Sequence, residues 1–396
     1  MKFVCVKCGH IEEKEPAALC SRCGGILRYE QDNVCKRYID EIMPNVLRYR
    51  PLLPVEGKEA VSLCEGNTPL ADLNEYAQSW GLKRLLVKCE FMNPTASFKD
   101  RAMAVSFTRA KELGVKKIIV ASAGNASSSA AAYGARAGID VYAIVPESCT
   151  KNKILQALAY GAKVIKTPGQ YSESHKLVED FCKANGMFNV TTTYSNPYNT
   201  AGYKTMGYEI YEQLGGSPDW IMVPVGAGPL LAGLYDAFAD LNRVLGNVKM
   251  PRLVACQVDR CDPIAKAYRE RLHCVEAFEM KKGTIASGLN DELKGYTQDG
   301  DYTLSCVYNS NGYAMSISEE EVVEATMRMS QSGFYIEPAS ATGLLVTKRM
   351  RAQDIIKKNE TVVMIATGSG LKNPIAEFDF KPVTVTDIKE LERIVL

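Results

Sequence analysis

The sequence lacks a charge excess of either sign and lacks long apolar runs. Its 396 residues carry 47 Lys and Arg against 46 Asp and Glu, which leaves a net charge of +1. Such a balance gives no indication of a nucleic-acid partner or of an acidic membrane surface. No run reaches the roughly 18 apolar residues that a membrane span needs, and Met1–Cys5 lacks the apolar stretch of a secretory signal. We therefore expect a cytoplasmic protein that binds neither nucleic acid nor membrane.

Cysteine, in contrast, is abundant, with 13 residues in the chain. Without a secretory signal, this number indicates reduced thiols and a bound metal rather than disulfides. Two C-x-x-C pairs, Cys5 with Cys8 and Cys20 with Cys23, are separated by eleven residues, and glycines follow both pairs. Four thiolates at this spacing can surround one Zn²⁺ ion and leave no position for water. Residues 1–30 are thus predicted to form a ribbon around a structural zinc ion.

Two other interpretations of the paired cysteines have less support. A redox-active C-x-x-C motif does not explain why the chain carries two of them. Nucleic-acid binding through the ribbon is disfavoured because its charges offset one another: Lys2, Lys7, Lys14 and Arg22 against Glu12, Glu13 and Glu15. The other nine cysteines are scattered singly, as small buried apolar residues are.

Beyond the ribbon, short β-branched runs alternate with longer helical stretches. The predicted strands are 117–120, 141–145, 162–165, 220–223, 253–255 and 361–365, and the predicted helices include 102–113, 127–137 and 319–332. Several strands are apolar throughout, as in sheets covered on both faces. The pattern predicts an α/β fold with mostly parallel sheets, running from about Asn45 to about Pro382. Within it, Pro51 and Pro54 favour an extended segment over a helix at 47–54.

The nine residues Asn93–Arg101 carry the strongest functional signal. Small and hydroxyl-bearing residues, among them Thr95 and Ser97, precede Lys99, and a helix is expected to follow. A lysine in this setting can lose its proton on desolvation and form a Schiff base. Alone, the pattern is better explained by a surface lysine at a helix start, where a cation is slightly unfavourable. Three later loops favour the catalytic interpretation.

These loops follow predicted strands, which is where open α/β sheets bind ligands. Ser122-Ala123-Gly124-Asn125 opens a small-residue helix that offers amides and hydroxyls to a substrate carboxylate. The glycines of 226–233 allow close approach of a phosphate, although their spacing is not that of a dinucleotide motif. In 366–372, a hydroxyl of Thr367 or Ser369 can meet a heterocyclic nitrogen and leave it unprotonated. Each loop alone is equally an ordinary turn, but together with a reactive lysine they indicate pyridoxal 5'-phosphate (PLP).

These motifs resemble those of the threonine synthase family of PLP-dependent enzymes, which has the tryptophan synthase β-type fold. The similarity extends over nearly the whole chain, through residues 65–70, 93–101, 122–125, 226–230, 337–340 and 367–372. The resemblance implies that Lys99 is the catalytic Schiff-base lysine, that Asn125 contacts the ring hydroxyl of the cofactor, and that Thr367 meets its pyridine nitrogen. It implies that the cofactor phosphate is held by Gly226, Ala227, Gly228, Pro229 and Leu230. It also implies substrate contacts from Thr95, Ser97, Ser122, Ala123 and Gly124.

For the domain organisation, the resemblance implies two open, mostly parallel sheet domains after the zinc ribbon. Residues 45–92 and 206–382 would form a large cofactor-binding domain. Residues 93–205 would form a small domain that carries Lys99 and the substrate loop.

Several positions depart from the threonine synthase pattern. Ala96 stands where glycine is common, which we expect to be a mild change, and Ala123 stands where a second hydroxyl is common. Ser369 replaces a frequent histidine. The loop 193–199 matters more, because that family tends to carry asparagine, serine and arginine there to hold the substrate phosphate. The positions offered here are Thr193, Tyr194 and Asn199, and the missing bidentate arginine contact would have to come from Lys153, Lys204 or another cation.

The resemblance implies conversion of O-phosphohomoserine and water to threonine and phosphate, with Lys99 moving protons at Cα and Cβ. A β-eliminating or β-replacing enzyme of the same fold, such as a threonine or serine dehydratase, is the alternative, favoured by loop 193–199 and by Ser122-Ala123. A third interpretation, a non-catalytic binding protein, predicts the loss of Lys99 or of the phosphate loop, and both are present. The expected substrate is a small amino acid, and a homodimer is the assembly to test.

Overall fold

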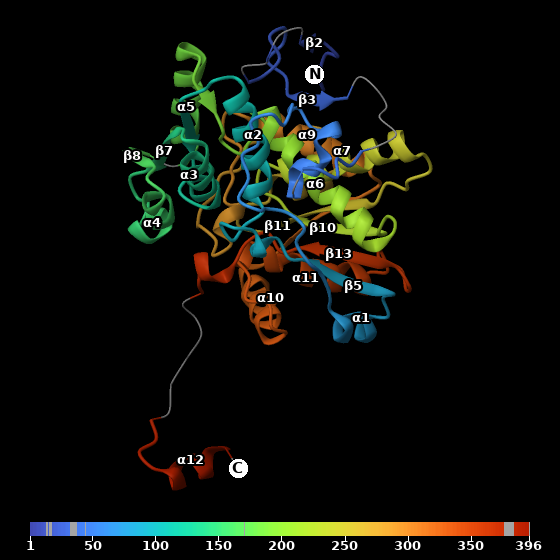
Figure 1. Ribbon diagram of the computed structural model, residues 1–396. Coiled ribbons are helices and arrows are strands. Elements are labelled where there is room, and N and C mark those ends of the chain that lie inside the picture. Colours follow the sequence, from blue (N-terminus) through green and yellow to red (C-terminus); the bar gives the residue numbers. More distant parts are fainter. Residues whose placement is uncertain are drawn as a thin grey trace.

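Three sheets organise the protein, as shown in a computed structural model that describes residues 1–12, 15, 18–31, 38–43, 45–169, 171–375 and 384–395. In Figure 1 the small N-terminal sheet lies at the top, a four-stranded sheet at the left and a six-stranded sheet below. The predicted α/β fold with mostly parallel sheets is confirmed. Among the described residues, no helix combines the length and apolarity that crossing a membrane would require.

The six-stranded sheet has the order β12-β11-β10-β13-β5-β4. Its strands are β4 (Leu70–Asp72), β5 (Arg84–Lys88), β10 (Trp220–Pro224), β11 (Arg252–Val258), β12 (Tyr313–Ile317) and β13 (Thr361–Ile365). All neighbours pair in parallel except β4, which lies antiparallel to β5 at the edge. The predicted strands 220–223, 253–255 and 361–365 are confirmed, whereas β5 and β12 were not among those predicted.

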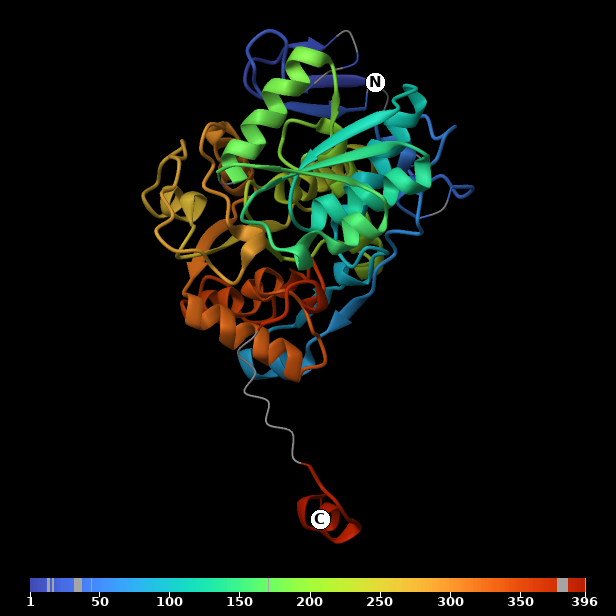
Figure 2. The same cartoon turned by 90° about the vertical axis from the view of Figure 1, so that its left-hand side faces the viewer.

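The four-stranded sheet is parallel throughout, with the order β8-β7-β6-β9. It contains β6 (Lys117–Ala121), β7 (Asp140–Pro146), β8 (Lys163–Thr167) and β9 (Phe188–Asn189), and it faces the viewer in Figure 2. The three strands predicted in this region are confirmed. Because all four strands are parallel, the segments that follow them leave from one edge of the sheet.

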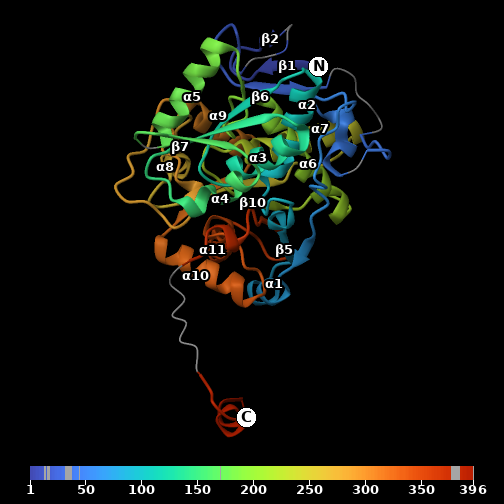
Figure 3. The same ribbon diagram turned by 60° about the vertical axis from the view of Figure 1, so that its left-hand side comes forward.

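Helices cover the sheets and alternate with the strands. They are α1 (Asn74–Trp80), α2 (Lys99–Glu112), α3 (Asn125–Ala137), α4 (Lys151–Ala159), α5 (Tyr171–Asn185), α6 (Pro197–Leu214), α7 (Pro229–Leu245), α8 (Pro263–Arg269), α9 (Thr297–Asn309), α10 (Glu319–Gln331), α11 (Pro338–Ala352) and α12 (Ile388–Val395). Short 3-10 helices lie at η1 (Asn45–Leu52), η2 (Glu90–Met92), η3 (Ser287–Leu289) and η4 (Gly370–Lys372). Helices α3 and α5 lie on opposite faces of the four-stranded sheet (Figure 3), and α12 lies apart from the body (Figure 1).

A buried ion network ties α2 and α6 to the six-stranded sheet. The guanidinium of Arg101, on α2, is fully buried and donates to Glu90 and to Glu209, with both contacts at 2.7 Å. Lys88, on β5, donates to the same Glu209 carboxylate at 2.8 Å. Removing one partner would leave an uncompensated buried charge, so the network fixes the orientation of α2. Lys99 is the first residue of that helix.

The N-terminal ribbon is an antiparallel sheet of β1 (Lys2–Cys5), β2 (Ile11–Glu12) and β3 (Leu27–Glu30). It packs against the main body through specific contacts. The rings of Phe3 and Tyr198, on α6, meet edge to face at 5.5 Å. Arg28 pairs with Asp236, on α7, at 3.6 Å. The ribbon is therefore docked on the helices that follow the substrate loop and the phosphate loop.

Outside the sheets, one prediction is wrong and the predicted domain limits stay predictions. The extended segment predicted from Pro51 and Pro54 is wrong, because residues 45–52 form the 3-10 helix η1 with Pro51 inside it. Its residues Val46, Leu47, Tyr49 and Leu52 are buried, and a short 3-10 helix tolerates one proline near its end. The predicted domain boundary between residues 205 and 206 falls inside α6, so the domain limits stay predictions. The predicted end of the body at Pro382 lies outside the described residues.

Candidate active site

The ε-amino group of Lys99 lies between two aromatic rings and a hydroxyl. Lys99 Nζ donates to Thr192 Oγ1 at 2.8 Å, and it lies 4.4 Å from the ring centre of Phe98 and 5.8 Å from that of Tyr203. Burial lowers the pKa of Lys99 to about 7, although Glu337 and Asp291 favour the charged form. A substantial fraction of the amine is therefore neutral near pH 7, as nucleophilic attack on a carbonyl carbon requires.

The segment before Lys99 is folded around Asp100. The Asp100 carboxylate accepts the Thr95 N–H at 2.7 Å and the Thr95 hydroxyl at 2.6 Å. The Thr95 carbonyl accepts from Lys372 Nζ at 2.8 Å. The Thr95 side chain, predicted to meet the substrate, is thus engaged within its own loop. The hydroxyl of Ser97, in contrast, is fully buried without a partner among the described residues, so it can meet a ligand.

Ala96 lies in a strained backbone conformation. Its φ of 62° lies in the left-handed region, where an L residue other than glycine is strained by about 1 kcal/mol. The conformation is held by two hydrogen bonds, from Ala96 N–H to the Asn93 carbonyl at 2.7 Å and from Ser369 N–H to the Ala96 carbonyl at 3.1 Å. Alanine at this position therefore carries backbone strain that glycine would not.

The loop after β10 forms a cradle at the start of α7. Gly228 has a φ of 109°, and a Cβ there would lie 2.0 Å from Thr303 Oγ1, so only glycine fits. The N–H groups of Gly226, Ala227 and Gly228 have no acceptor within the described parts of the chain. Pro229 and Leu230 then open α7. Free amides before a helix N-terminus bind phosphate, so this cradle fits the phosphate of PLP.

Asn125 begins α3, and Glu337 holds its amide from across the site. Asn125 Nδ2 donates to both oxygens of the Glu337 carboxylate, at 2.9 and 3.1 Å. Burial raises the pKa of Glu337, and the bond from Asn125 and the charges of Lys372 and Lys99 oppose that rise. The predicted contact of Asn125 with the cofactor hydroxyl stays a prediction. Glu337, which precedes α11, is the residue that orients Asn125 for it.

The predicted carboxylate loop, Ser122 to Gly124, lies between β6 and α3. Ser122 Oγ accepts the Gly124 N–H at 3.2 Å, which closes the turn. The Ala123 N–H has no acceptor among the residues that the structure describes. The loop therefore offers a free amide and a hydroxyl at a helix N-terminus, as a carboxylate site requires.

Thr367 forms a hydroxyl pair with Ser340, on α11. Their oxygens lie 2.7 Å apart, and both side chains are buried. Ser340 Oγ also accepts the Gly368 N–H at 3.0 Å. Ser340 can donate the hydrogen bond between the two hydroxyls. The Thr367 O–H is then free to donate to another acceptor. This arrangement fits an unprotonated pyridine nitrogen.

The acidic side chain of Asp291 lies next to the phosphate cradle. A Cβ on Gly226 would lie 3.3 Å from the Asp291 Cβ. Asp291 Oδ1 accepts the Tyr296 hydroxyl at 2.7 Å, and the Tyr296 ring lies 4.4 Å from the imidazole of His175, on α5. Burial raises the pKa of Asp291, and Lys99 opposes that rise. An acidic group thus lies within electrostatic reach of Lys99.

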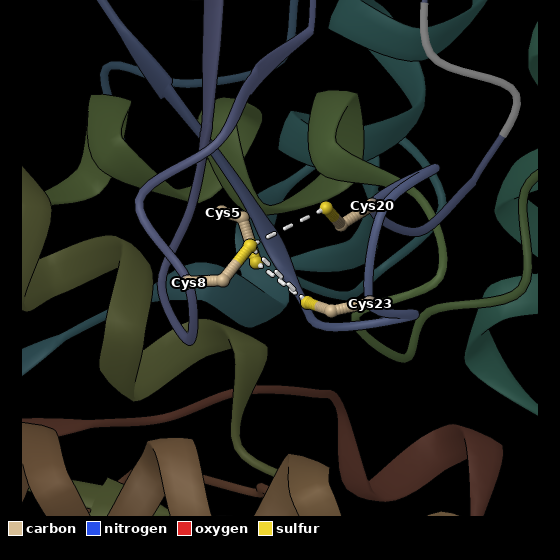
Figure 4. A group of neighbouring side chains, drawn as sticks. All are labelled: Cys5, Cys8, Cys20 and Cys23. Carbon is tan, nitrogen blue, oxygen red and sulfur yellow. Dashed lines mark hydrogen bonds between the residues drawn. The ribbon is translucent and has the colours of Figure 1, made fainter.

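The four predicted zinc ligands converge at one end of the ribbon (Figure 4). The Sγ atoms of Cys5, Cys8, Cys20 and Cys23 all lie within 4.8 Å of one another. Four sulfurs around one zinc ion, each about 2.3 Å from it, would be spaced at about 3.8 Å. The donor set and the spacing therefore fit a closed tetrahedral site.

The sequence analysis gave no role to several residues that the fold brings to Lys99. They are Thr192, Tyr203, Asp291, Ser340 and Lys372. Thr192 belongs to a run of three threonines that follows β9 after one residue, Val190. A hydroxyl run at the end of a parallel strand is a signal that could have found Thr192. Tyr203 lies inside α6, where no local pattern distinguishes it from a core residue.

Comparisons with known proteins agree with this geometry. Residues 61–368 match a family described as pyridoxal-phosphate dependent enzyme. The chain is 35% identical to a threonine synthase of Methanocaldococcus jannaschii, covering 98% of both chains, and 34% identical to one of Methanosarcina acetivorans, covering 95% of this chain and 93% of the other. Among solved structures, maize serine racemase matches with a TM-score of 0.65 at 19% identity, covering 83% of this chain and 91% of that one. A threonine deaminase isoform of Solanum lycopersicum matches with a TM-score of 0.62 at 18% identity, covering 83% and 87%. The chain thus belongs to the threonine synthase family of PLP-dependent enzymes.

Proposed function

We propose that the protein is a threonine synthase that converts O-phosphohomoserine and water to threonine and phosphate. The observation that carries the proposal is Lys99, a half-buried lysine whose amine has a pKa of about 7 and lies among the loops that fit PLP. The 35% identity to a protein named threonine synthase, over 98% of both chains, supports the choice of reaction.

Each residue of the site then has a defined task. PLP, when bound, supplies an electron sink next to Cα. Lys99, as a neutral amine, takes and returns protons at Cα and Cβ. Thr367 donates to the pyridine nitrogen, and Asn125 orients the ring through its hydroxyl. Ser97 and the free amide of Ala123 bind the substrate carboxylate, for which they have unused hydrogen-bonding capacity.

The substrate phosphate needs a cation that loop 193–199 does not supply. Tyr194 and Asn199 are engaged internally, with Thr303 at 2.9 Å and with the Val190 and Thr191 carbonyls. Lys204 pairs with Asp240 and lies over the ring of Tyr29, in the ribbon. Lys153 is exposed in the first turn of α4, which follows β7 at the sheet edge that carries loop 122–124. Lys153 is therefore the cation we assign to the substrate phosphate.

A second candidate is β-elimination from threonine or serine. The observation that favours it is the half-buried Asp291 at the phosphate cradle, because its carboxylate, when ionised, repels a substrate phosphate. Threonine and serine carry no charge on their side chains and are not rejected in this way.

One assay separates the two candidates. PLP-loaded protein is incubated with O-phosphohomoserine, threonine or serine, and phosphate, threonine and 2-oxoacid are measured, with Lys99→Ala as the control. Equal amounts of phosphate and threonine support threonine synthase. In that case Lys153→Met should raise the KM for O-phosphohomoserine about tenfold, the value of one charge-assisted hydrogen bond, and Lys151→Met should not. Formation of 2-oxoacid without phosphate supports elimination, and inactivity on all three substrates contradicts both.

We further infer that Cys5, Cys8, Cys20 and Cys23 hold one structural Zn²⁺ ion. The convergence of four sulfurs within 4.8 Å supports this assignment, since a closed tetrahedral set leaves no open position for catalysis. Metal analysis of the purified protein should find about one zinc ion per chain, and none in Cys5→Ser/Cys8→Ser. A homodimer and a cytoplasmic location stay predictions.

A further inference from the structure

The Lys99 amine has a dedicated acceptor outside the cofactor loops. Thr192 Oγ1, at 2.8 Å, is the acceptor for Lys99 Nζ among the residues that the structure describes. The backbone on both sides of Thr192 is fixed. Ala121 N–H donates to Thr191 Oγ1 at 2.9 Å, and Thr193 Oγ1 lies 3.2 Å from His175 Nε2. The segment that carries Thr192 is therefore held in place independently of Lys99.

A second hydroxyl lies next to this contact. Tyr203, on α6, is fully buried, and its hydroxyl has no hydrogen-bonding partner in the described parts of the chain. Its ring is fixed against Phe98, with ring centres 5.1 Å apart, and against α7, where a Cβ on Gly233 would lie 2.7 Å from the Tyr203 Cβ. Burial raises the pKa of Tyr203, and the Thr192 hydroxyl opposes that rise. Pairing with Thr192 therefore satisfies a buried hydroxyl that would otherwise cost free energy.

We propose that Thr192 and Tyr203 form a resting site for the Lys99 amine while that amine is free of the cofactor, a proposal that rests on the role of Lys99 in the proposed function. Thr192 Oγ1 accepts an N–H of Lys99, and the Thr192 O–H is directed at the hydroxyl oxygen of Tyr203. Both are positioning residues, because they act on the substrate through Lys99.

A hydroxyl suits the Lys99 amine better than a carboxylate would, because the amine has to stay neutral. To move protons at Cα and Cβ of a bound substrate, Lys99 would have to stay near these atoms with its lone pair available. A carboxylate acceptor would favour the ammonium form and remove the base, whereas a neutral hydroxyl orients the amine with a much smaller effect. The resting site therefore keeps the base near its target without protonating it.

Substitutions at Thr192 test the proposal on the PLP-loaded protein. Thr192→Val keeps the volume and removes the acceptor, so kcat should fall about tenfold, the value of one hydrogen bond, with KM nearly unchanged. Thr192→Ser keeps the hydroxyl and should retain most of the activity. The matched control is Thr200→Val, which removes a buried hydroxyl of α6 that has no hydrogen-bonding partner among the residues that the structure describes. If Thr192→Ser is impaired and Thr192→Val is not, Thr192 acts only by packing and the proposal is wrong.

Tyr203→Phe tests the second hydroxyl, with Tyr211→Phe on the same helix as its control. We expect a smaller fall in kcat than for Thr192→Val. Because Tyr203 acts through Thr192, the double variant Thr192→Val/Tyr203→Phe should be no slower than Thr192→Val alone. If the falls in kcat of the two single variants multiply in the double variant, the two residues act independently and the shared site is contradicted.

A spectroscopic readout separates this inference from the proposed function. The rate at which cofactor-free protein forms the absorbance of lysine-bound PLP depends on the neutral fraction of Lys99. Loss of the acceptor in Thr192→Val removes a contact that stabilises the ammonium form, so the midpoint of the pH dependence should move to lower pH. Thr200→Val should leave it unchanged. If the wild-type protein does not form this absorbance, the proposed function fails. If it does, and Thr192→Val matches Thr200→Val in both kcat and midpoint, the resting site is refuted.

Discussion

The cysteine ribbon and the Lys99 site are built in opposite ways. The four sulfurs come from a stretch that begins at Cys5 and ends at Cys23, and they meet because two short turns bring them together. The polar groups of the Lys99 site come from segments between Thr95 and Lys372, which the two parallel sheets bring to one place. One site is local in the sequence and the other depends on the whole fold.

The two sites also differ in how their polar groups are satisfied. Around Lys99 most groups already pair with one another, as in Asn125 with Glu337 and Ser340 with Thr367. The four cysteine sulfurs contact one another, and thiolates this close at neutral pH need a cation. We therefore infer that the fold itself preforms the Lys99 site, whereas the order of the ribbon depends on its metal.

The largest expected effect comes from removing Lys99. Lys99→Ala should lower turnover at least about 10²- to 10⁴-fold, because it removes the group that moves protons at the substrate. It should also abolish the absorbance of lysine-bound PLP while the zinc content stays unchanged. Lys111→Ala, at an exposed position of the same helix, is the control for both readouts. Persistence of the absorbance in Lys99→Ala would contradict the site assignment.

The converse experiment removes the metal. Cys20→Ser should abolish zinc binding and expose the backbone of residues 1–30 to hydrogen exchange, because a closed zinc site stabilises a small ribbon directly. The absorbance of lysine-bound PLP should persist. Cys274→Ser, at an exposed cysteine outside the ribbon, should change neither property. A ribbon that stays protected without metal would show that it folds by its contacts with α6 and α7 alone.

The pH dependence of the rate of PLP binding tests whether the Lys99 amine has the lowered pKa that the site predicts. Burial lowers the pKa of Lys99 to about 7, so the amine is protonated below that pH and neutral above it. The loading rate should therefore rise about tenfold between pH 6 and pH 8 and then level off. A rate that continues to rise toward pH 10 would indicate an ordinary, solvated lysine.

The smallest effect concerns local strain in the Lys99 loop. Ala96→Gly should stabilise the protein by about 1 kcal/mol, because it relieves the left-handed φ of 62°. Ala135→Gly, at an exposed position of α3, should destabilise it by about 1 kcal/mol, since glycine there weakens a helix. Denaturant unfolding measures both, and equal signs would show that Ala96 is unstrained.

The comparison also explains what the sequence could and could not predict. The cysteine spacing, the Lys99 run and the apolar strands are local patterns, and the structure brings the predicted cysteines together and confirms all six predicted strands. Strand β5 was missed because its apolar run is only three residues long and lies between Arg84 and Lys88. The buried Lys88 amine is satisfied by Glu209, Gln213 and the Thr68 carbonyl, which the fold brings to it. Tyr203 was missed because its proximity to Lys99 arises from tertiary packing alone. Thr192 lies in a threonine run close to the end of β9, and its contact with Lys99 depends on where the fold places that strand.

Identification of the residue that binds the cofactor tests the central claim most directly. The PLP-loaded protein is treated with borohydride, which reduces the carbon–nitrogen link between cofactor and lysine to a stable bond, and its peptides are mapped by mass spectrometry. We predict the cofactor mass on Lys99 and on no other lysine. Labelling of another residue, such as Lys372, or no labelling at all, would contradict the account.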